Sequence, residues 1–394
     1  MDNTRIFYLM MMIVHLFFFF SVGICKQFVV TDFGAVPDGK TDSRKALETA
    51  WQRACQTPGG SVLVPRGSFF VSMADFYGPC NGPTLFEHRG TLVASADPTL
   101  GERDHWITFD EVDGLTVFGD GVLDGNGALS WSRCGGLARC RQQLPPATLK
   151  MNYVTNSMVR GVRLINSKMF HVIIWASDGV WVRGVRITAP ADSPNTDGIH
   201  IGDSNNTRIT GSRISTGDDC ISIGEGCTGV NVTRVRCGPG HGISIGSLGK
   251  YPSEGGVERV HVRNCTFLGT ENGLRIKTWA QSLSSTVVSG VVYEEIEMRG
   301  VGNPILIDQF YCPGGSCQPG GESSVEIRGV KFANVWGSSA SLASVSLKCS
   351  RTHPCRDIEF VGLNLTRGGR PTIALCANAD DRFGGSGQIP SRCS

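Results

Sequence analysis

The chain has 394 residues, enough for one large domain or two ordinary ones, and its 37 basic and 35 acidic residues leave a formal net charge of +2. This balance, with no basic block in the sequence, argues against nucleic acid as the main partner. If the ligand is an acidic polymer, the cations that bind it must be few and individually placed, because the field of the whole protein is too weak to attract it.

The first 25 residues have the pattern of a secretory signal peptide. Arg5 precedes an apolar run that ends in four phenylalanines. A cut before Lys26 would leave Gly23 and Cys25 at positions −3 and −1, where signal peptides carry small residues. The alternative is a signal anchor that stays in the membrane, but no basic stop-transfer cluster follows the run. We therefore expect a secreted protein of the extracellular space or cell wall, with a single domain over residues 26–394 and no membrane contact after cleavage.

The cysteines also fit an exported protein. One of the 15, Cys25, falls in the signal, and the remaining 14 are an even number, as a disulfide framework requires. Cys227 and Cys265 are the pair with the weakest support, and either could be free. Zinc is the alternative, but no CxxC pair has a matching second pair. The favoured pairs are Cys55/Cys80, Cys134/Cys140, Cys220/Cys237, Cys312/Cys317, Cys349/Cys355 and Cys376/Cys393. Sequons for glycans occur at Asn205, Asn231, Asn264 and Asn364.

One helix is predicted near the N-terminus, and strands follow it. Within Ser43–Trp51 the apolar residues recur on one helical face. After that an eight-residue unit repeats, apolar at positions 1, 3, 6 and 8, with its phase broken between positions 3 and 6, as a strand does at a bend. It begins at Leu115, Ser157, Val180, Thr207, Val230, Val260, Val291, Val325 and Ile358.

A second apolar strand follows most copies of this unit. These strands are Gly198–Ile201, Cys220–Ile223, Gly242–Ile245, Gly273–Ile276 and Pro304–Ile307. Repeats of short strands and turns indicate a solenoid in which each coil buries its apolar side on its neighbours. We therefore predict an all-β, right-handed parallel β-helix with a short N-terminal helix. A β-sandwich or barrel is the alternative, but it needs tight hairpin turns, and few are evident.

Polar residues recur at matching positions of neighbouring coils, which lie about 4.8 Å apart. Two residues before the apolar anchor of the second strand stand Asp197, Asp219 and His241, with Asp218 beside Asp219; Arg275 and Lys277 follow on the next coil. Strict alternation would turn Asp197 and Asp219 inward unless the chain bends just before the next isoleucine. The repeat thus gathers three carboxylates, an imidazole and two cations at one wall.

Such a group suits glycoside hydrolysis, in which one carboxylic acid protonates the leaving oxygen and another carboxylate steers water or attacks the sugar. Crowded carboxylates cannot all ionise at ordinary pKa values, so one should keep its proton in mildly acidic solution. The two cations would pair with the carboxylate of a uronic acid. Taken singly, Asn195–Gly198 and Gly217–Asp219 are also ordinary turn sequences. Their coincidence at one register favours a site.

At these residues the chain resembles the polygalacturonases, glycoside hydrolase family 28, over nearly all of the mature chain. The resemblance rests on Asn195-Thr196-Asp197-Gly198-Ile199-His200, Gly217-Asp218-Asp219-Cys220, Gly240-His241-Gly242, Arg275-Ile276-Lys277 and Tyr311. It implies an active, inverting hydrolase of the α-1,4-galacturonosyl links of pectin, with no metal and no cofactor. Inversion would ordinarily imply a wide carboxylate spacing of roughly 6.5–9.5 Å.

The resemblance also assigns roles to single residues. Asp218 would be the general acid, Asp197 and Asp219 would hold the attacking water, and His241 would support the acid. The residues implied to bind galacturonate are Arg275, Lys277, Tyr311 and Asn195. The expected partner is a pectin or polygalacturonate chain, the expected oligomeric state is a monomer, and the expected pH optimum is acidic.

Further segments resemble the plant pollen-type exopolygalacturonases, which favours release of galacturonate from chain ends and leaves endo action as the alternative. These segments are Phe33–Asp42, Gly78–Cys80, Ser193–Pro194 and Gly246–Pro252. A Ca²⁺-dependent pectate lyase on the same architecture is a less favoured reading, because the aspartates lack the spread of oxygen ligands that Ca²⁺ prefers. A non-catalytic pectin-binding solenoid is another, and it would have no need of Asp218.

Overall fold

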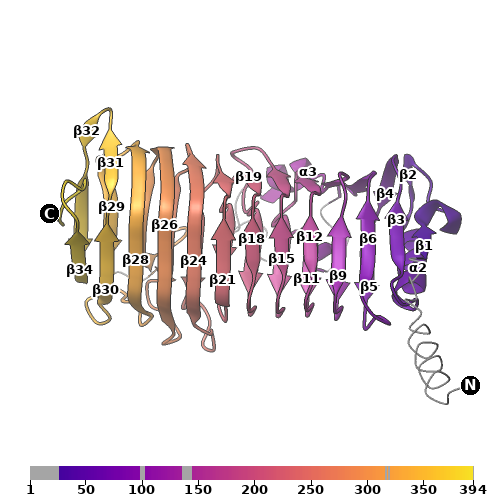
Figure 1. The fold of residues 1–394 in the computed structure, drawn as a ribbon, viewed down its shortest axis with the longest axis horizontal. Coiled ribbons are helices and arrows are strands. Elements are labelled where there is room, and N and C mark those ends of the chain that lie inside the picture. Colours follow the sequence, from indigo (N-terminus) through magenta and orange to yellow (C-terminus); the bar gives the residue numbers. More distant parts are fainter. Residues whose placement is uncertain (1–25, 98–102, 135–143, 316, 318–319, 394) are drawn as a thin grey trace, which may run out of the picture.

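The computed structural model describes residues 26–97, 103–134, 144–315, 317 and 320–393. The predicted signal peptide and Cys140, half of the predicted Cys134/Cys140 bridge, lie outside these ranges. The strands wind into successive coils that stack into a right-handed parallel β-helix (Figure 1), which confirms the predicted fold. Among the described helices, none has the length and apolar character needed to cross a membrane.

Within the described ranges the strands form two sheets, which we call sheet A and sheet B. Pairing in both is parallel, except that β31 and β32 pair antiparallel. The strands of sheet B are β5 (Ala74–Tyr77), β8 (His105–Asp110), β11 (Ala147–Asn152), β14 (Val172–Trp175), β17 (Ile199–Gly202), β20 (Ile221–Ile223), β23 (Ile243–Leu248), β25 (Asn272–Trp279), β27 (Asn303–Tyr311), β29 (Ala343–Lys348) and β33 (Ile373–Ala377).

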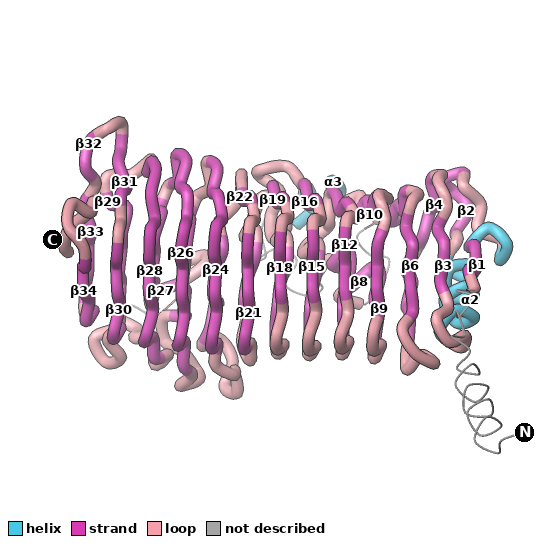
Figure 2. The backbone as a smooth tube through the Cα atoms, viewed as in Figure 1, coloured by secondary structure: helices cyan, strands magenta, loops and turns pink. Residues whose placement is uncertain are grey.

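Sheet A supplies the rest of each coil and runs along the face seen in Figure 2. Its strands are β1 (Gln27–Val29), β2 (Asp38–Asp42), β3 (Ser61–Val64), β4 (Ser68–Val71), β6 (Thr84–His88), β7 (Thr91–Ala94), β9 (Leu115–Phe118), β10 (Val122–Asp124), β12 (Met158–Arg160), β13 (Arg163–Ile165), β15 (Trp181–Arg183), β16 (Arg186–Thr188), β18 (Arg208–Thr210), β19 (Arg213–Ser215), β21 (Thr228–Thr233), β22 (Arg236–Cys237), β24 (Val257–Leu268), β26 (Val287–Val301), β28 (Glu326–Ser339), β30 (Cys355–Val361), β31 (Asn364–Arg367), β32 (Arg370–Pro371) and β34 (Ala379–Gly384).

The helix α2 (Arg44–Cys55) lies at the N-terminal end of the solenoid and confirms the predicted helix. Its buried face includes Leu47 and Trp51, which meet the first coils and cover apolar surface that no earlier coil can cover. A 3-10 helix, η1 (Val30–Phe33), precedes it. A second short helix, α3 (Ala128–Cys134), was not predicted.

From β9 onward, nine coils of sheet A turn a corner at the fifth position of the eight-residue unit, and this explains the break in phase. The residue there always has a positive φ, a conformation that favours glycine and asparagine. The copy predicted to start at Val325 is wrong by five residues, because Val330 is the residue that pairs with both Val291 and Ile358. The corner residues are Gly119, Gly161, Gly184, Gly211, Arg234, Asn264, Glu295, Asn334 and Gly362.

The interior is one continuous apolar core filled by stacked residues of both sheets. On sheet B, Ile201, Ile223, Ile245, Ile276 and Ile307 follow one another at the same register position. Five of the six predicted disulfides are confirmed: Cys55–Cys80, Cys220–Cys237, Cys312–Cys317, Cys349–Cys355 and Cys376–Cys393. Cys227 and Cys265, the pair with the weakest support, are both free and buried.

Candidate active site

The site residues predicted from the repeat lie on consecutive coils of sheet B. Ile199, Ile221, Ile243, Leu274 and Ile305 pair in one register through β17, β20, β23, β25 and β27. The polar residues that stand just before these apolar residues, or alternate with them along the strand, therefore lie next to their counterparts on the adjacent coils. This alignment confirms that the predicted polar column exists.

The chain bends before Ile221, which resolves the direction of Asp219. Cys220 and Ile221 are consecutive and both fully buried, and Cys220 is tied inward by its disulfide to Cys237. Two successive inward side chains break the alternation, so the Asp219 carboxylate lies with the outward-facing residues of the next coils. It accepts a hydrogen bond from Ser244 Oγ at 2.8 Å.

Asp219 is held by two cations that reach back across two coils. Arg275 Nη2 lies 2.7 Å from Oδ1 of Asp219, and Lys277 Nζ lies 2.8 Å from Oδ2. Ser222 and Ser244 occupy the same register position as Arg275 on the two preceding coils, and their short side chains leave room for its guanidinium. Arg275 Nε also donates to Ser244 Oγ at 2.9 Å. The predicted outward direction of both cations is confirmed, although both are buried.

Asp219 and Asp197 have opposite pKa shifts. Burial by itself would raise the pKa of Asp219, but the charges of Arg275 and Lys277 outweigh burial and lower the pKa to about 2. For Asp197, burial raises the pKa well above its ordinary value, and the negative charges of Asp218 and Asp219 raise it further. Asp197 is therefore the carboxyl whose surroundings favour the protonated form, whereas those of Asp219 favour the ionised form.

Asp218 is the most exposed of the three aspartates and lies against His241. The side chain of Asp218 is 22% exposed, whereas residues Asp197 and Asp219 are 6% and 1% exposed. His241 Nδ1 lies 3.1 Å from Oδ1 of Asp218, and its Nε2 lies 3.3 Å from Oε2 of Glu271. The hydrogen bond to Asp218, followed by the charges of Asp218 and Glu271, raises the pKa of His241 despite partial burial.

Of the remaining predicted residues, Asn195 stands two positions before Asp197, and Tyr311 lies on β27, one coil beyond Arg275 and Lys277. Lys277 Nζ lies 5.3 Å from the centroid of the Tyr311 ring, so Tyr311 shares its cation with Asp219. The ring of Trp279 meets Tyr311 edge-on, with centroids 5.9 Å apart. Asn195 has a φ of 54° in the loop before Asp197, a conformation asparagine tolerates, and this supports a turn role for the residue.

Several residues that fix the site were missed by the sequence reasoning. Thr196 Oγ1 accepts a hydrogen bond from the backbone N–H of Gly217 at 3.1 Å, which ties the loop of Asp197 to the loop of Asp218. His171, from the preceding coil, donates its backbone N–H to the carbonyl of Asp197 at 2.8 Å. Glu271 and Trp279 flank His241 and Tyr311. The signal that could have revealed Ser222 and Ser244 was their shared register with Arg275.

The donor set at the site fits a metal poorly. Single ligand atoms of Asp218, Asp219 and His241 lie within 4.8 Å of one another, which is close enough to hold an ion. Both Asp219 oxygens, however, are already paired with Arg275 and Lys277. A divalent cation would have to displace these side chains or lie against their positive charges. The residues present therefore favour an anionic ligand over a cation.

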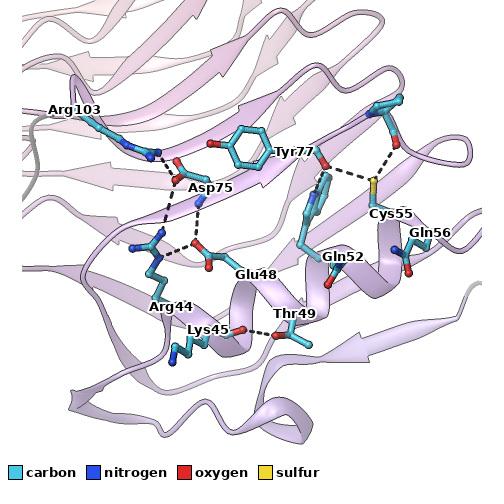
Figure 3. Close-up of a pocket in the computed structure, with 12 residues that line it drawn as sticks. Arg44, Lys45, Glu48, Thr49, Gln52, Cys55, Gln56, Asp75, Tyr77 and Arg103 are labelled. Carbon is cyan, nitrogen blue, oxygen red and sulfur yellow. Dashed lines mark hydrogen bonds and ion pairs between the residues drawn. The ribbon is translucent and has the colours of Figure 1, made fainter.

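A separate cavity of about 680 Å³ lies between α2 and β5, at the N-terminal end of the solenoid (Figure 3). Asp75 shares a register column with Ser222, five coils away, or about 24 Å at the usual strand spacing. The carboxylate of Asp75 is paired with both Arg44 and Arg103 and is buried. This cavity is therefore distinct from the carboxylate cluster.

Comparisons with known proteins agree with this geometry. The model of glycosyl hydrolases family 28 matches residues 55–386. An exopolygalacturonase of Zea mays is 42% identical over 358 residues, covering 90% of this chain and 87% of that protein. An exopolygalacturonase of Oenothera organensis is 42% identical over 361 residues, covering 90% and 98%. A polygalacturonase of Prunus persica is 42% identical over 370 residues, covering 92% of each.

Solved structures share the fold at lower identity. The exopolygalacturonase of Thermotoga maritima superposes with a TM-score of 0.74 at 19% identity, over 90% of each chain. The endo-xylogalacturonan hydrolase of Aspergillus tubingensis superposes with a TM-score of 0.81 at 22% identity, over 93% of this chain and 98% of its own. The family model and the relatives above 40% identity confirm the resemblance seen in the sequence: this chain belongs to glycosyl hydrolases family 28.

Proposed function

We propose that this protein is a secreted polygalacturonase that hydrolyses the α-1,4-galacturonosyl links of pectin. The observation that carries the proposal is the convergence of Asp197, Asp218 and Asp219 beside Arg275 and Lys277 on adjacent coils. Carboxylates supply the acid and base of glycoside hydrolysis, and the two cations suit a substrate with a carboxylate on each sugar. The names of the relatives from Zea mays, Oenothera organensis and Prunus persica support the same substrate.

The proposed acid is Asp218, because its carboxyl is the most accessible to a sugar and lies against His241. It donates a proton to the glycosidic oxygen as the bond to the anomeric carbon breaks. Water attacks that carbon and passes a proton to the carboxylates of Asp197 and Asp219. In the free protein the raised pKa belongs to Asp197, so the proton must be redistributed within the cluster when substrate binds.

Arg275, Lys277 and Tyr311 are the proposed contacts to galacturonate, with Asn195 in the adjoining loop. The side chains of Arg275 and Lys277 are 10% and 9% exposed. Only a small part of each is thus open to a ligand, and a sugar carboxylate would share them with Asp219. This sharing would place the sugar beside the aspartates.

Inversion of the anomeric carbon is part of the proposal, but the carboxylate spacing does not support it. Oxygens of Asp218 and Asp219 approach within 4.8 Å, less than the roughly 6.5–9.5 Å typical of inverting enzymes. The expectation of a wide spacing is therefore wrong for this pair. Inversion rests on the family resemblance alone, and the first anomer released is the measurement that tests it.

We also propose exo action, with galacturonate released from chain ends, because two of the relatives described above are exopolygalacturonases. Secretion follows from the signal pattern of residues 1–25 and agrees with five disulfides among the described residues. A monomer remains the expected state.

The test is incubation of the secreted protein with polygalacturonate in chelator at mildly acidic pH, with reducing ends and viscosity followed together. Monomer released with little early loss of viscosity supports an exo hydrolase. A steep fall in viscosity with mixed oligomers would overturn exo for endo action. A parallel incubation with Ca²⁺ and no chelator serves as the comparison, and an unsaturated product that forms only there would identify a lyase. Asp218→Asn should abolish turnover, whereas Asp192→Asn, at an exposed aspartate in the loop before Asp197, should not.

A further inference from the structure

Eight arginines lie exposed on four consecutive coils of sheet A, and we call this group the arginine face. The register of the sheet stacks Arg163, Arg186, Arg213 and Arg236 in one column through β13, β16, β19 and β22. Arg160 and Arg183 stack in a second column on β12 and β15. The whole set, all exposed, is Arg160, Arg163, Arg183, Arg186, Arg208, Arg213, Arg234 and Arg236.

These strands lie side by side on the face seen in Figure 2, where β15, β18 and β21 run parallel and β16, β19 and β22 continue beyond the corner. Seven of the arginines occupy outward positions of the eight-residue unit on the two sides of that corner, and Arg234 stands at the corner itself. Successive coils are about 4.8 Å apart, so the column from Arg163 to Arg236 spans about 14 Å. The result is a straight row of cations parallel to the long axis of the solenoid.

The arginine face lacks the acidic partners found elsewhere on sheet A. Its four eight-residue units contain no aspartate or glutamate. None of its arginines makes an ion pair with any residue the structure describes. At its edges, Asp120 and Glu297 influence Arg163 and Arg236 without pairing with them. Farther along the same sheet, Arg263, Arg299 and Arg382 are each paired with a glutamate or aspartate.

Sheet A thus carries arginines in ion pairs on one part and arginines without ion pairs on another. This contrast points to a binding role for the unpaired group. Eight like charges so close together repel one another, and a net charge of +2 for the whole chain shows that the excess is local. A shallow cavity of about 340 Å³ crosses this face and is lined by Trp181, Arg208, Asn231 and Arg234, among others. Trp181 contributes a half-buried ring to this cavity, and the guanidinium of Arg183 lies over that ring, 5.5 Å from its centroid.

We propose that the arginine face is a second binding surface for de-esterified polygalacturonate, separate from the candidate active site. A linear polymer with one carboxylate on each sugar complements a linear row of guanidinium groups, which bind carboxylates as forks. The choice of polymer rests on the proposed function, since the substrate of the active site is the same chain.

Such a surface would act by raising the local concentration of substrate. It lies on strands of sheet A, whereas the aspartates lie at the strands of sheet B, so a polymer segment held there leaves the active site free. A chain tethered at one point presents its ends to the active site at a higher effective concentration than free solution does. An enzyme that acts only at chain ends gains most from this, because ends are scarce in a long polymer.

The test is affinity electrophoresis in gels containing polygalacturonate, with every protein also carrying Asp218→Asn so that the polymer survives. The triple variant Arg186→Gln, Arg213→Gln, Arg236→Gln should bind about tenfold more weakly at low salt. This factor is what the loss of three exposed ion pairs with the polymer typically amounts to. The matched control is Arg299→Gln, Arg328→Gln, Arg382→Gln, which removes as many paired arginines from the same sheet and should bind normally.

The effect should also depend on charge and on polymer length. Binding by the parent should weaken steeply with salt and should be lost on fully methyl-esterified pectin. In the wild-type background the triple variant should hydrolyse digalacturonate at the normal kcat/KM and lose efficiency on the long polymer. Equal binding by the triple variant and the control would overturn the proposal. So would tighter binding to double-stranded DNA than to polygalacturonate at equal charge concentration.

Two further outcomes separate this inference from the proposed function and from glycosylation. A protein that binds polygalacturonate through these arginines but never hydrolyses it would overturn the proposed function and leave the second surface standing. Asn231 is an exposed sequon residue in the cavity of this face. Binding by the secreted glycoprotein supports the proposal, whereas binding only after enzymatic deglycosylation would overturn it, because the native surface would then be covered.

Discussion

Lys277 Nζ lies 2.8 Å from Asp219 Oδ2, although the two residues are 58 positions apart in the sequence. Lys277 is on β25, and Asp219 comes just before β20, two coils earlier. The pair is buried, and a third member, Arg275, completes it. Its geometry links stability to function, because the cations that would bind the substrate are also those that keep Asp219 ionised. Changes on either side of the pair should affect both properties.

Lys277→Met should reduce both stability and activity. It removes one of two cations from the buried Asp219 carboxylate, and breaking a buried pair typically costs about 3–5 kcal/mol. The pKa of Asp219, now about 2, should rise. The control is Lys331→Met, which breaks an exposed pair with Glu359 and should cost under about 1 kcal/mol. Thermal unfolding of both variants measures the difference, and similar losses in the two would contradict the buried-pair account.

Asp197→Asn should raise the melting temperature at neutral pH and strongly reduce activity. Because the pKa of folded Asp197 is raised above 3.8, its contribution to stability is fully present below that value. It is lost as the pH rises through the folded pKa, where a buried charge must form. Asparagine carries no charge at any pH. The gain in melting temperature should shrink toward zero in acid, while kcat falls at least about a hundredfold. The difference in melting temperature between Asp197→Asn and the wild type is measured at pH 7 and at pH 4. A smaller gain at pH 7 than at pH 4 would refute this prediction.

Glu271→Gln should move the alkaline limb of the pH–rate profile to lower pH. The charge of Glu271 helps to raise the pKa of His241, so its loss lets the imidazole deprotonate sooner. The side chain of Glu271 is 62% exposed, so the shift should be less than about one pH unit, and kcat at acidic pH should be nearly unchanged. Glu258→Gln, at an exposed glutamate on β24, is the control. Identical profiles for the two variants would exclude His241 as the group that sets this limb.

Cys227 and Cys265 should resist alkylation until the protein unfolds. Both thiols are buried, and burial raises the pKa of each to about 12, which leaves almost no thiolate at neutral pH. Iodoacetamide should label neither residue in native protein and both in denaturant without reductant, as peptide mass spectrometry would show. Labelling of Cys312 or Cys317 under the second condition would instead contradict the disulfide assignment.

The repeat made the fold and the main site residues predictable, because stacked coils convert sequence register into spatial contact. Asp197, Asp219, His241, Arg275 and Lys277 came together for that reason. Contacts outside the register were not predictable: the bridge from His241 to Glu271 joins residues at unmatched positions. The identity of the protonated aspartate also depends on burial, which a sequence pattern does not measure.

The arginine face is a second feature that the sequence alone did not reveal. In the sequence its arginines are spread over residues 160–236, and no stretch of them is a basic block. The sequence predicts few cations for an acidic polymer, and the proposed arginine face would add to them, because the winding of the chain collects dispersed residues into a row. The copy of the unit predicted to start at Val325 was wrong because apolar residues alternate on both sides of a corner. The same pattern therefore fits a start at Val325 and the observed start at Val330.

The most direct test of the account is proton NMR of polygalacturonate as it is cut in chelator at mildly acidic pH, by the wild-type protein and by Asp218→Asn. We predict free galacturonate as the product, the β-anomer appearing before mutarotation, and no product from Asp218→Asn. An unsaturated uronate, or undiminished turnover by Asp218→Asn, would contradict the assignment of Asp197, Asp218 and Asp219 as the hydrolytic centre.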